Sequence, residues 1–372
     1  MPRVRLSLSL LLLSLSRTAF ATEEPEREPP KAEPPPPSTG KRALATTAAV
    51  FPGAIVHGAG HYVLGDKDTA GKLLLAEGVG LGMVAGGGLG LFLTGASRYT
   101  VVPFAALGMF GIGMFSSALF ADIYGSAATD QNGAWSRALS GPARFESELG
   151  YRYISDAHFG YSDFVVERFA LWIARTRLEP SLWSSFQGDN ARYRFLLGQR
   201  LYGARPGQPR LLVDFVELEV AATHHSYAGD YFERTTVESS THARWDLAHV
   251  GPSLRGAFVE GSLGYAFNVT SFNFPGVDLP NDYDDLLLAT MAFGVTLRGP
   301  AATGSEVMMF YDHRHDDYAS GMLISGLGSG VAGHLGLRGR WFFDERYGVA
   351  AEGMFGSAIV AGASILIREG AP

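Results

Sequence analysis

From residue 145 to residue 368, apolar and polar side chains alternate along the chain with a period of two. In the first stretch Leu149, Tyr151 and Tyr153 fall on one face, while Glu148 and Arg152 fall on the other. Successive side chains of a strand point to opposite faces, so the alternation predicts strands whose two faces have different surroundings. The pattern recurs through the region, which favours a sheet with one apolar face and one polar face.

Turn residues between the alternating stretches divide this region into about twelve strands. The predicted strands are 145–154, 163–175, 181–186, 191–203, 209–221, 242–250, 256–270, 285–298, 304–313, 330–343, 346–355 and 359–368. Many of them are long enough for the roughly 9–11 residues that cross a bilayer at a tilt. The boundaries also predict longer connections on one side and shorter turns on the other, an asymmetry typical of membrane barrels. We therefore predict a mainly β protein with a small α part: an antiparallel up-and-down membrane β-barrel preceded by a helical hairpin.

The composition limits the kinds of partner that the chain is expected to bind. The chain has no cysteine, which excludes disulfides and thiolate metal sites. Its formal net charge is -7 and no basic tract follows the N-terminus, so nucleic acid is not an expected partner. High glycine (47 residues) and aromatic content (12%), with only 18% charged residues, suit tight turns and a lipid-facing surface. Membrane lipid is the expected partner.

Residues 1–21 have the features of a secretory signal peptide. Arg3 and Arg5 form a basic start, residues 6–15 are largely apolar, and Ala19 and Ala21 give a small-x-small cleavage site. Residues 22–42 are rich in glutamate and proline and predict an extended linker. The chain is therefore expected to leave the cytoplasm.

Residues 43–128 predict an apolar helical module rich in glycine and alanine. The segments 69–93 and 101–123 have the length of membrane-spanning helices. Gly78, Gly82, Gly86 and Gly90 repeat every four residues, which predicts a helix face that another backbone can approach closely. The two segments predict a tightly packed hairpin that spans the membrane, plugs the barrel or packs beside it.

Through its signal peptide and residues 145–368, the chain resembles the outer-membrane β-barrel proteins of Gram-negative bacteria. The resemblance implies an integral outer-membrane protein with a structural, binding or narrow-pore role. In a second hypothesis the hairpin anchors the chain in the inner membrane, and the β region forms a periplasmic sandwich or small-ligand barrel. Residues 51–65, with Pro52, Gly53 and Tyr62, are similar to the turn before helical hairpins in small bacterial membrane proteins.

The polar faces of the predicted strands contain charged residues of both signs. Facing inward in a barrel of this size, opposite charges are expected to pair and to fill the lumen rather than leave an open channel. Several arginines along one wall would instead favour an anion-selective path, so a small ligand or ion is a candidate partner. The residues predicted to line the lumen are Arg192, Arg194, Arg298, Arg338, Arg340, Glu260 and Glu352.

His57 and His61 are four residues apart, the spacing that places two imidazoles on one helix face for a metal. Glu77 is the nearest candidate carboxylate, in an apolar helix where an ionisable group is costly. A metal or proton-relay site is one hypothesis. A structural role with hydrogen-bonded side chains is favoured, because Gly58 and Gly60 indicate a turn between the histidines.

A second group, His313, His315 and Asp316, contains residue types that bind transition metals. These residues begin a predicted external loop, where polar side chains are expected without a metal. The sequence has neither a Gly-x-Ser-x-Gly nucleophile motif nor a nucleotide-binding loop, and no catalytic residue or organic cofactor is predicted. A non-enzymatic role is favoured, with an envelope enzyme that uses His57 and His61 as the alternative.

Overall fold

The computed structural model describes thirteen stretches of the chain. They are residues 37–95, 100–128, 142–156, 162–186, 188, 190–206, 208, 212–227, 232–297, 304–314, 318, 322–324 and 328–370. The described helices and strands belong to one compact unit, Thr39–Pro372. The predicted signal peptide and three predicted site residues, Arg298, His315 and Asp316, lie outside the described residues.

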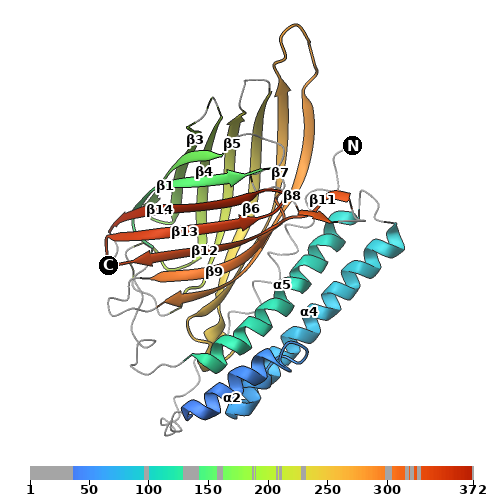
Figure 1. Ribbon diagram of the computed structural model, residues 1–372, viewed down its shortest axis with the longest axis vertical. Coiled ribbons are helices and arrows are strands. Elements are labelled where there is room, and N and C mark those ends of the chain that lie inside the picture. The colour runs from blue at the N-terminus through green and yellow to red at the C-terminus, as the bar shows by residue number, and fades with distance from the viewer. Residues whose placement is uncertain are drawn as a thin grey trace. The chain divides into compact units, whose positions relative to one another are not determined.

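Twelve antiparallel strands of the described region close into a barrel, with neighbours in chain order (Figure 1). They are β1 (Phe145–Ser155), β2 (Asp163–Ile173), β3 (Thr176–Ser185), β4 (Ala191–Gly203), β5 (Phe215–Ser226), β6 (Phe232–Asp246), β7 (Ala257–Phe272), β8 (Asp282–Leu297), β9 (Ser305–Asp312), β12 (His334–Phe342), β13 (Tyr347–Phe355) and β14 (Ile359–Glu369). Pairing of β1 with β14 closes the barrel. The remaining strands, β10 (Met322–Ile324) and β11 (Gly328–Ala332), pair only with each other. The predicted up-and-down barrel is confirmed, and the sandwich alternative is wrong.

The two faces of the barrel wall follow the alternation in the sequence. On β1, Leu149 and Tyr151 are 54% and 44% exposed on the outside, whereas Glu148 and Arg152 are 8% and 5% exposed on the inside. Because successive side chains of a strand alternate between faces, the register of the strand determines which of its residues face the inside and which face the outside. The barrel is therefore polar inside and apolar outside.

Several predicted strand boundaries are wrong. The third strand begins at Thr176 rather than residue 181, and it contains Pro180. Proline has no N–H to donate, and it is tolerated here because pairing with β2 is interrupted at Glu179 and Pro180. Residues 222–241, predicted to form a long loop, lie mostly in β5 and β6. The apolar alternation fades there because many outward side chains, such as Thr235, are polar.

The predicted separation of long and short connections is also wrong. The segment between β6 and β7, predicted as a short turn, contains two 3-10 helices, η2 (Leu247–His249) and η3 (Pro252–Leu254). Strand β4 is irregular, because its pairing with β5 shifts between Arg200 and Tyr202. Asp214 precedes β5, so Glu217 and Glu219 share the inner face.

Four helices precede the barrel in the described region: α2 (Thr39–Val50), α3 (Ala59–Leu64), α4 (Lys67–Thr94) and α5 (Val101–Ala127). Helix α2 begins inside the segment predicted as a linker, residues 22–42. Helices α4 and α5 form the expected hairpin, and the Asp66 carboxylate caps α4 by accepting the Thr69 N–H at 3.1 Å.

The hairpin packs through Gly80 and Gly87, which lie outside the predicted stripe, and through only part of that stripe, since a Cβ on Gly90 would meet the Phe104 ring of α5. A Cβ on Gly87 would lie 2.7 Å from the Phe104 carbonyl oxygen, and one on Gly80 would lie 2.8 Å from the Gly111 carbonyl oxygen. At Gly78 and Gly82 a Cβ would meet nothing within 4 Å. A helix has 3.6 residues per turn, so a strict four-residue repeat winds around it, whereas a seven-residue spacing stays on one face.

The hairpin lies beside the barrel, against its outer wall, and not in the lumen. Phe120 of α5 packs against Phe293 of β8 with ring centroids 5.6 Å apart, and a Cβ on Gly113 would touch the Met291 side chain. At the base of the hairpin, Lys72 Nζ donates to the Val250 carbonyl at 2.9 Å. These contacts fix the module to β7, β8 and the segment between β6 and β7.

Candidate functional site

The barrel encloses a cavity of about 540 Å³, lined by residues of most strands. Ten arginines, eight glutamates and one aspartate contribute to its wall, so the two signs nearly balance. Six of the residues predicted to line the lumen are on this wall: Arg192, Arg194, Arg338, Arg340, Glu260 and Glu352. Charges of one sign do not segregate to one side.

Arginine and glutamate side chains form a belt of ion pairs around this cavity. The belt begins with Arg340 of β12, which pairs with Glu146 of β1. Arg168 of β2 then bridges Glu146 at 3.0 Å and Glu179 at 3.4 Å, and Arg177 of β3 contacts Glu179 at 2.7 Å. Each carboxylate joins two cations on different strands.

The belt continues through β5, β6, β7 and β9. Its further contacts are Arg177–Glu219 (2.6 Å), His242–Glu219 (3.3 Å), His242–Glu260 (2.9 Å), Arg244–Glu260 (2.6 Å) and Arg244–Glu306 (2.7 Å). Glu306 lies opposite Arg340 in the pairing of β9 with β12, so the belt returns to its starting strand. Removing one partner would leave a buried charge unpaired, which typically costs about 3–5 kcal/mol. The belt therefore holds the inner wall in one arrangement.

Two residues between β9 and β12 extend into the lumen near one end. Arg314 pairs with Glu238 of β6, which also pairs with Arg194 of β4. The Tyr318 hydroxyl donates to Asn190 Oδ1 at 2.9 Å, and its ring stacks on Trp183 with centroids 5.4 Å apart. The sequence prediction placed this segment in an external loop and missed both residues. The sequence feature that could have identified this segment is an aromatic residue, Tyr318, among polar residues.

The opposite end of the lumen is narrowed by buried aromatic rings. Phe258 is fully buried, and Phe342 is 4% exposed. The Arg244 guanidinium lies 4.0 Å from the Phe258 ring centroid, and the Arg368 guanidinium lies 3.8 Å from that of Phe342. Cations over aromatic faces are stabilised by the ring quadrupole. Aromatic side chains thus flank the belt at both ends.

The two histidines of the predicted site contact different carboxylates, His57 that of Glu77 and His61 that of Asp122. The His57 N–H donates to Glu77 Oε2 at 2.8 Å, and the His57 ring Nδ1 lies 3.9 Å from the same oxygen. His61 Nδ1 lies 2.6 Å from Asp122 Oδ1, and both side chains are fully buried. Burial lowers the pKa of His57, although Glu77 and Asp122 act in the opposite direction.

Asp122 was not predicted as a partner, because it lies far from the histidines in the sequence. The sequence feature that could have identified Asp122 is the one that identified Glu77, an ionisable residue in an apolar helix.

Within the described part of the chain, no group of three His, Asp or Glu residues could hold a metal ion. Of the second predicted cluster only His313 is described, and its Nδ1 lies 2.9 Å from the Tyr311 hydroxyl. Metal binding at either place stays a prediction.

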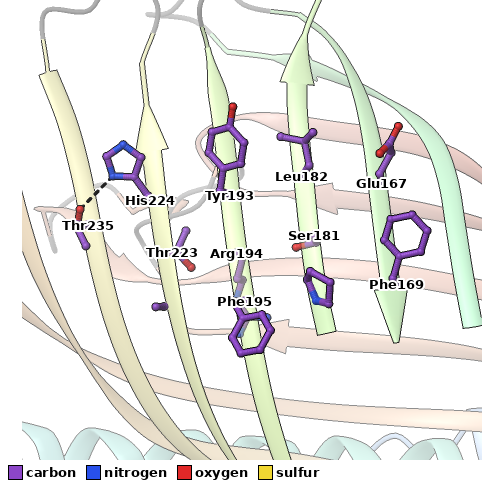
Figure 2. A pocket seen from close by; sticks show the side chains of 12 residues that line it. Glu167, Phe169, Ser181, Leu182, Tyr193, Arg194, Phe195, Thr223, His224 and Thr235 are labelled. Atoms are coloured by element: carbon purple, nitrogen blue, oxygen red, sulfur yellow. Dashed lines mark hydrogen bonds between the residues drawn. The ribbon is translucent and has the colours of Figure 1, made fainter. Parts of the chain in front are cut away.

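A second hollow, of about 420 Å³, lies on the outer wall of β2 to β6. Figure 2 shows Phe169, Tyr193 and Phe195 around it, with His224 near its rim. His224 Nδ1 lies 3.1 Å from the Thr235 hydroxyl. The lining is mainly apolar, which suits contact with hydrocarbon rather than chemistry on a polar substrate.

No family model matches the sequence, and no curated protein matches it. Among solved structures, the chain is similar to the outer membrane protein Omp33 of Acinetobacter baumannii, with 11% identity and a TM-score of 0.32 over 62% of this chain and 99% of that one. It is also similar to the translocator domain of autotransporter NalP from Neisseria meningitidis, with 10% identity and a TM-score of 0.35 over 64% and 90%. Because these scores are low, the fold assignment depends on the strand pairing described above.

Proposed function

We propose that this chain is an integral outer-membrane β-barrel whose lumen is closed to free diffusion, with a structural or ligand-holding role. The belt of ion pairs around the lumen is the observation that supports it best. An open aqueous channel needs a continuous path between the side chains of opposite walls, and here paired charges and aromatic rings narrow the lumen around its cavity.

The outer surface supports a position in a membrane. Large apolar side chains are exposed around most of the wall, including Leu149, Phe195, Val220, Leu337 and Ile365. Exposed apolar patches beyond a few hundred Å² are rare on soluble monomers. The strands have 8 to 16 residues, a range that includes the length needed to cross a bilayer at a tilt.

The cavity suits a small ligand. Its volume lies within the roughly 300–1,000 Å³ typical of small-molecule sites. The near balance of charges favours a compound that both donates and accepts hydrogen bonds over a simple ion. Arg192 favours a second candidate, a narrow anion path, because it lines the cavity and makes no ion pair with any described carboxylate.

Localisation is tested by separating inner and outer membranes and running the protein on gels with and without boiling. We expect outer-membrane recovery and a boiling-dependent shift in mobility. Recovery in the inner membrane without a shift would contradict the proposal and favour the helix-anchored alternative.

Closure is tested by conductance in planar lipid bilayers. The unmodified protein should give no steady open-channel current, and Glu238→Ala, which removes the carboxylate shared by Arg194 and Arg314, should raise the current. The control is Val220→Ala on the outer wall, which should change nothing. A steady anion-selective current from the unmodified protein would instead support the narrow path.

A further inference from the structure

Helices α4 and α5 have the length of membrane spans but lack the burial of core helices. They contain 28 and 27 residues, and only 22% and 17% of their most apolar windows are buried. Large side chains remain uncovered, among them Leu75 (67% exposed), Leu89 (57%) and Phe92 (82%). A helix that is apolar on all sides and little buried by protein requires an apolar solvent.

Along the apolar length of the hairpin, the charged side chains do not face outward. Between residue 73 and Thr94, and throughout α5, the only ionisable side chains other than Tyr124 are Glu77 and Asp122. They are 6% and 0% exposed and accept hydrogen bonds from the turn that contains His57. The outward surface of this length therefore has no charge to keep in water.

The surface that the hairpin covers is itself part of the barrel's outer wall. Phe120 and Gly113 of α5 contact Phe293 and Met291, which are outward residues of β8. The uncovered apolar faces of α4 and α5 are thus continuous with the apolar wall on both sides of the contact. A bilayer that surrounds the barrel at the level of Phe293 and Met291 would therefore also surround the hairpin.

We infer that the α4–α5 hairpin is embedded in the same bilayer as the barrel, with lipid hydrocarbon as the partner of its outward face. The 22 residues from Leu73 to Thr94 rise about 33 Å, close to the roughly 30 Å hydrocarbon thickness. Charged Asp68 and Lys72 lie just before this length, at one end of the hairpin. Thr94 and Thr100, whose hydroxyls lie 2.9 Å apart, mark the other end.

This inference depends on the proposed function, since it needs the barrel to be in a bilayer. The absence of cysteine from the sequence allows each position to be probed by one introduced cysteine carrying a nitroxide spin label. The test variants are Leu81→Cys and Leu89→Cys on the hairpin, with Val220→Cys on the barrel wall and Asp278→Cys in the β7–β8 connection as references. Collisions with oxygen, which dissolves in hydrocarbon, are compared with collisions with a polar nickel complex.

We expect the labels at both hairpin positions to give the same oxygen-to-nickel collision ratio as Val220→Cys. This ratio should be at least about tenfold above that of Asp278→Cys, because polar solutes are excluded from hydrocarbon. Nickel access at the hairpin with lipid access at Val220→Cys would overturn this inference alone. Nickel access at all sites would overturn the proposed function as well. Protection from both reagents at the hairpin would mean a protein partner, such as a second copy, and would also overturn the inference.

If a cysteine variant fails to assemble, the unmodified chain can be labelled in vesicles whose acyl chains contain a diazirine. Peptides from α4 and α5 should then be labelled as strongly as peptides from β4 and β5. Labelling confined to the strands would refute lipid contact by the hairpin.

Discussion

Asp122 joins the hairpin to the turn before it, and its replacement by asparagine should loosen that turn. Oδ2 accepts the N–H groups of Gly58 and Gly60 at 2.9 and 3.1 Å. Oδ1 accepts the N–H of His61 at 3.1 Å and lies 2.6 Å from the His61 ring Nδ1. The carboxylate and the imidazole are both fully buried, so water cannot replace any of these bonds.

The size of the effect follows from the number of bonds lost. The amide side chain in the variant Asp122→Asn would keep one oxygen but place an NH₂ group against two N–H donors. A hydrogen bond to a charged group contributes about 1.5–3 kcal/mol, and breaking a buried charged pair costs about 3–5 kcal/mol. We therefore expect a loss of about 3–5 kcal/mol in the stability of the turn. At 1.4 kcal/mol per tenfold, its open population should rise by a factor between about 10² and about 4 × 10³.

Hydrogen exchange of the amides of Gly58, Gly60 and His61 in the membrane-reconstituted protein measures this opening directly. The control is Asp68→Asn, because the Asp68 side chain is 78% exposed and, among the described residues, makes an ion pair only with Lys72. Exposed pairs contribute about 0–1 kcal/mol, so the control should change exchange by less than about tenfold. Unchanged protection in Asp122→Asn, with the barrel still folded by its gel shift, would refute the reasoning.

Three further predictions concern the hairpin, the lumen and a turn. Gly87→Leu should separate α4 from α5, because its Cβ would meet the backbone of α5, and Gly78→Leu should not; cross-linking between introduced cysteines distinguishes them. Glu260→Gln weakens the contacts of this side chain with His242 and Arg244 and should lower barrel stability by about 1–3 kcal/mol, measured as the temperature of the gel shift. Hydrogen bonds from the backbone N–H groups of Tyr347 and Arg346 lower the pKa of Asp344 below its ordinary value of 3.8. Their contribution to folding stability is therefore complete above pH 3.8 and is lost as the pH falls through the lower pKa of the folded state. An NMR titration midpoint at or above 3.8 would contradict this prediction.

The sequence was sufficient for the barrel wherever outward side chains are apolar. Strand β1 is an example, with Leu149 and Tyr151 outside and Glu148 inside. It was insufficient for β5 and β6, where Thr235 on the outer face removes the contrast between the two faces. Hydrophobic periodicity reports only differences between environments, so a strand that is polar on both faces resembles a loop.

Partners within the candidate sites were harder to predict than the faces on which their members lie. The inward position of Arg340 follows from its strand, but its pairing with Glu146 depends on the closure of the barrel. In the same way, the contact of Asp122 with His61 depends on how the hairpin folds back. Local patterns specify orientation, whereas tertiary geometry specifies which oppositely charged groups meet.

The barrel and the hairpin share one distribution of charge, although one is made of strands and the other of helices. Glu260 and Arg244 face the lumen, and Glu77 and Asp122 face the base of the hairpin, while Leu337 and Phe92 are exposed outside. A protein folded in water buries its apolar groups and exposes its charges, because hydration of charge is strongly favourable. The inverted distribution here is stable only in hydrocarbon. A periplasmic domain tethered by the hairpin would expose the whole apolar wall of the barrel to water, which is the strongest physical argument against that alternative.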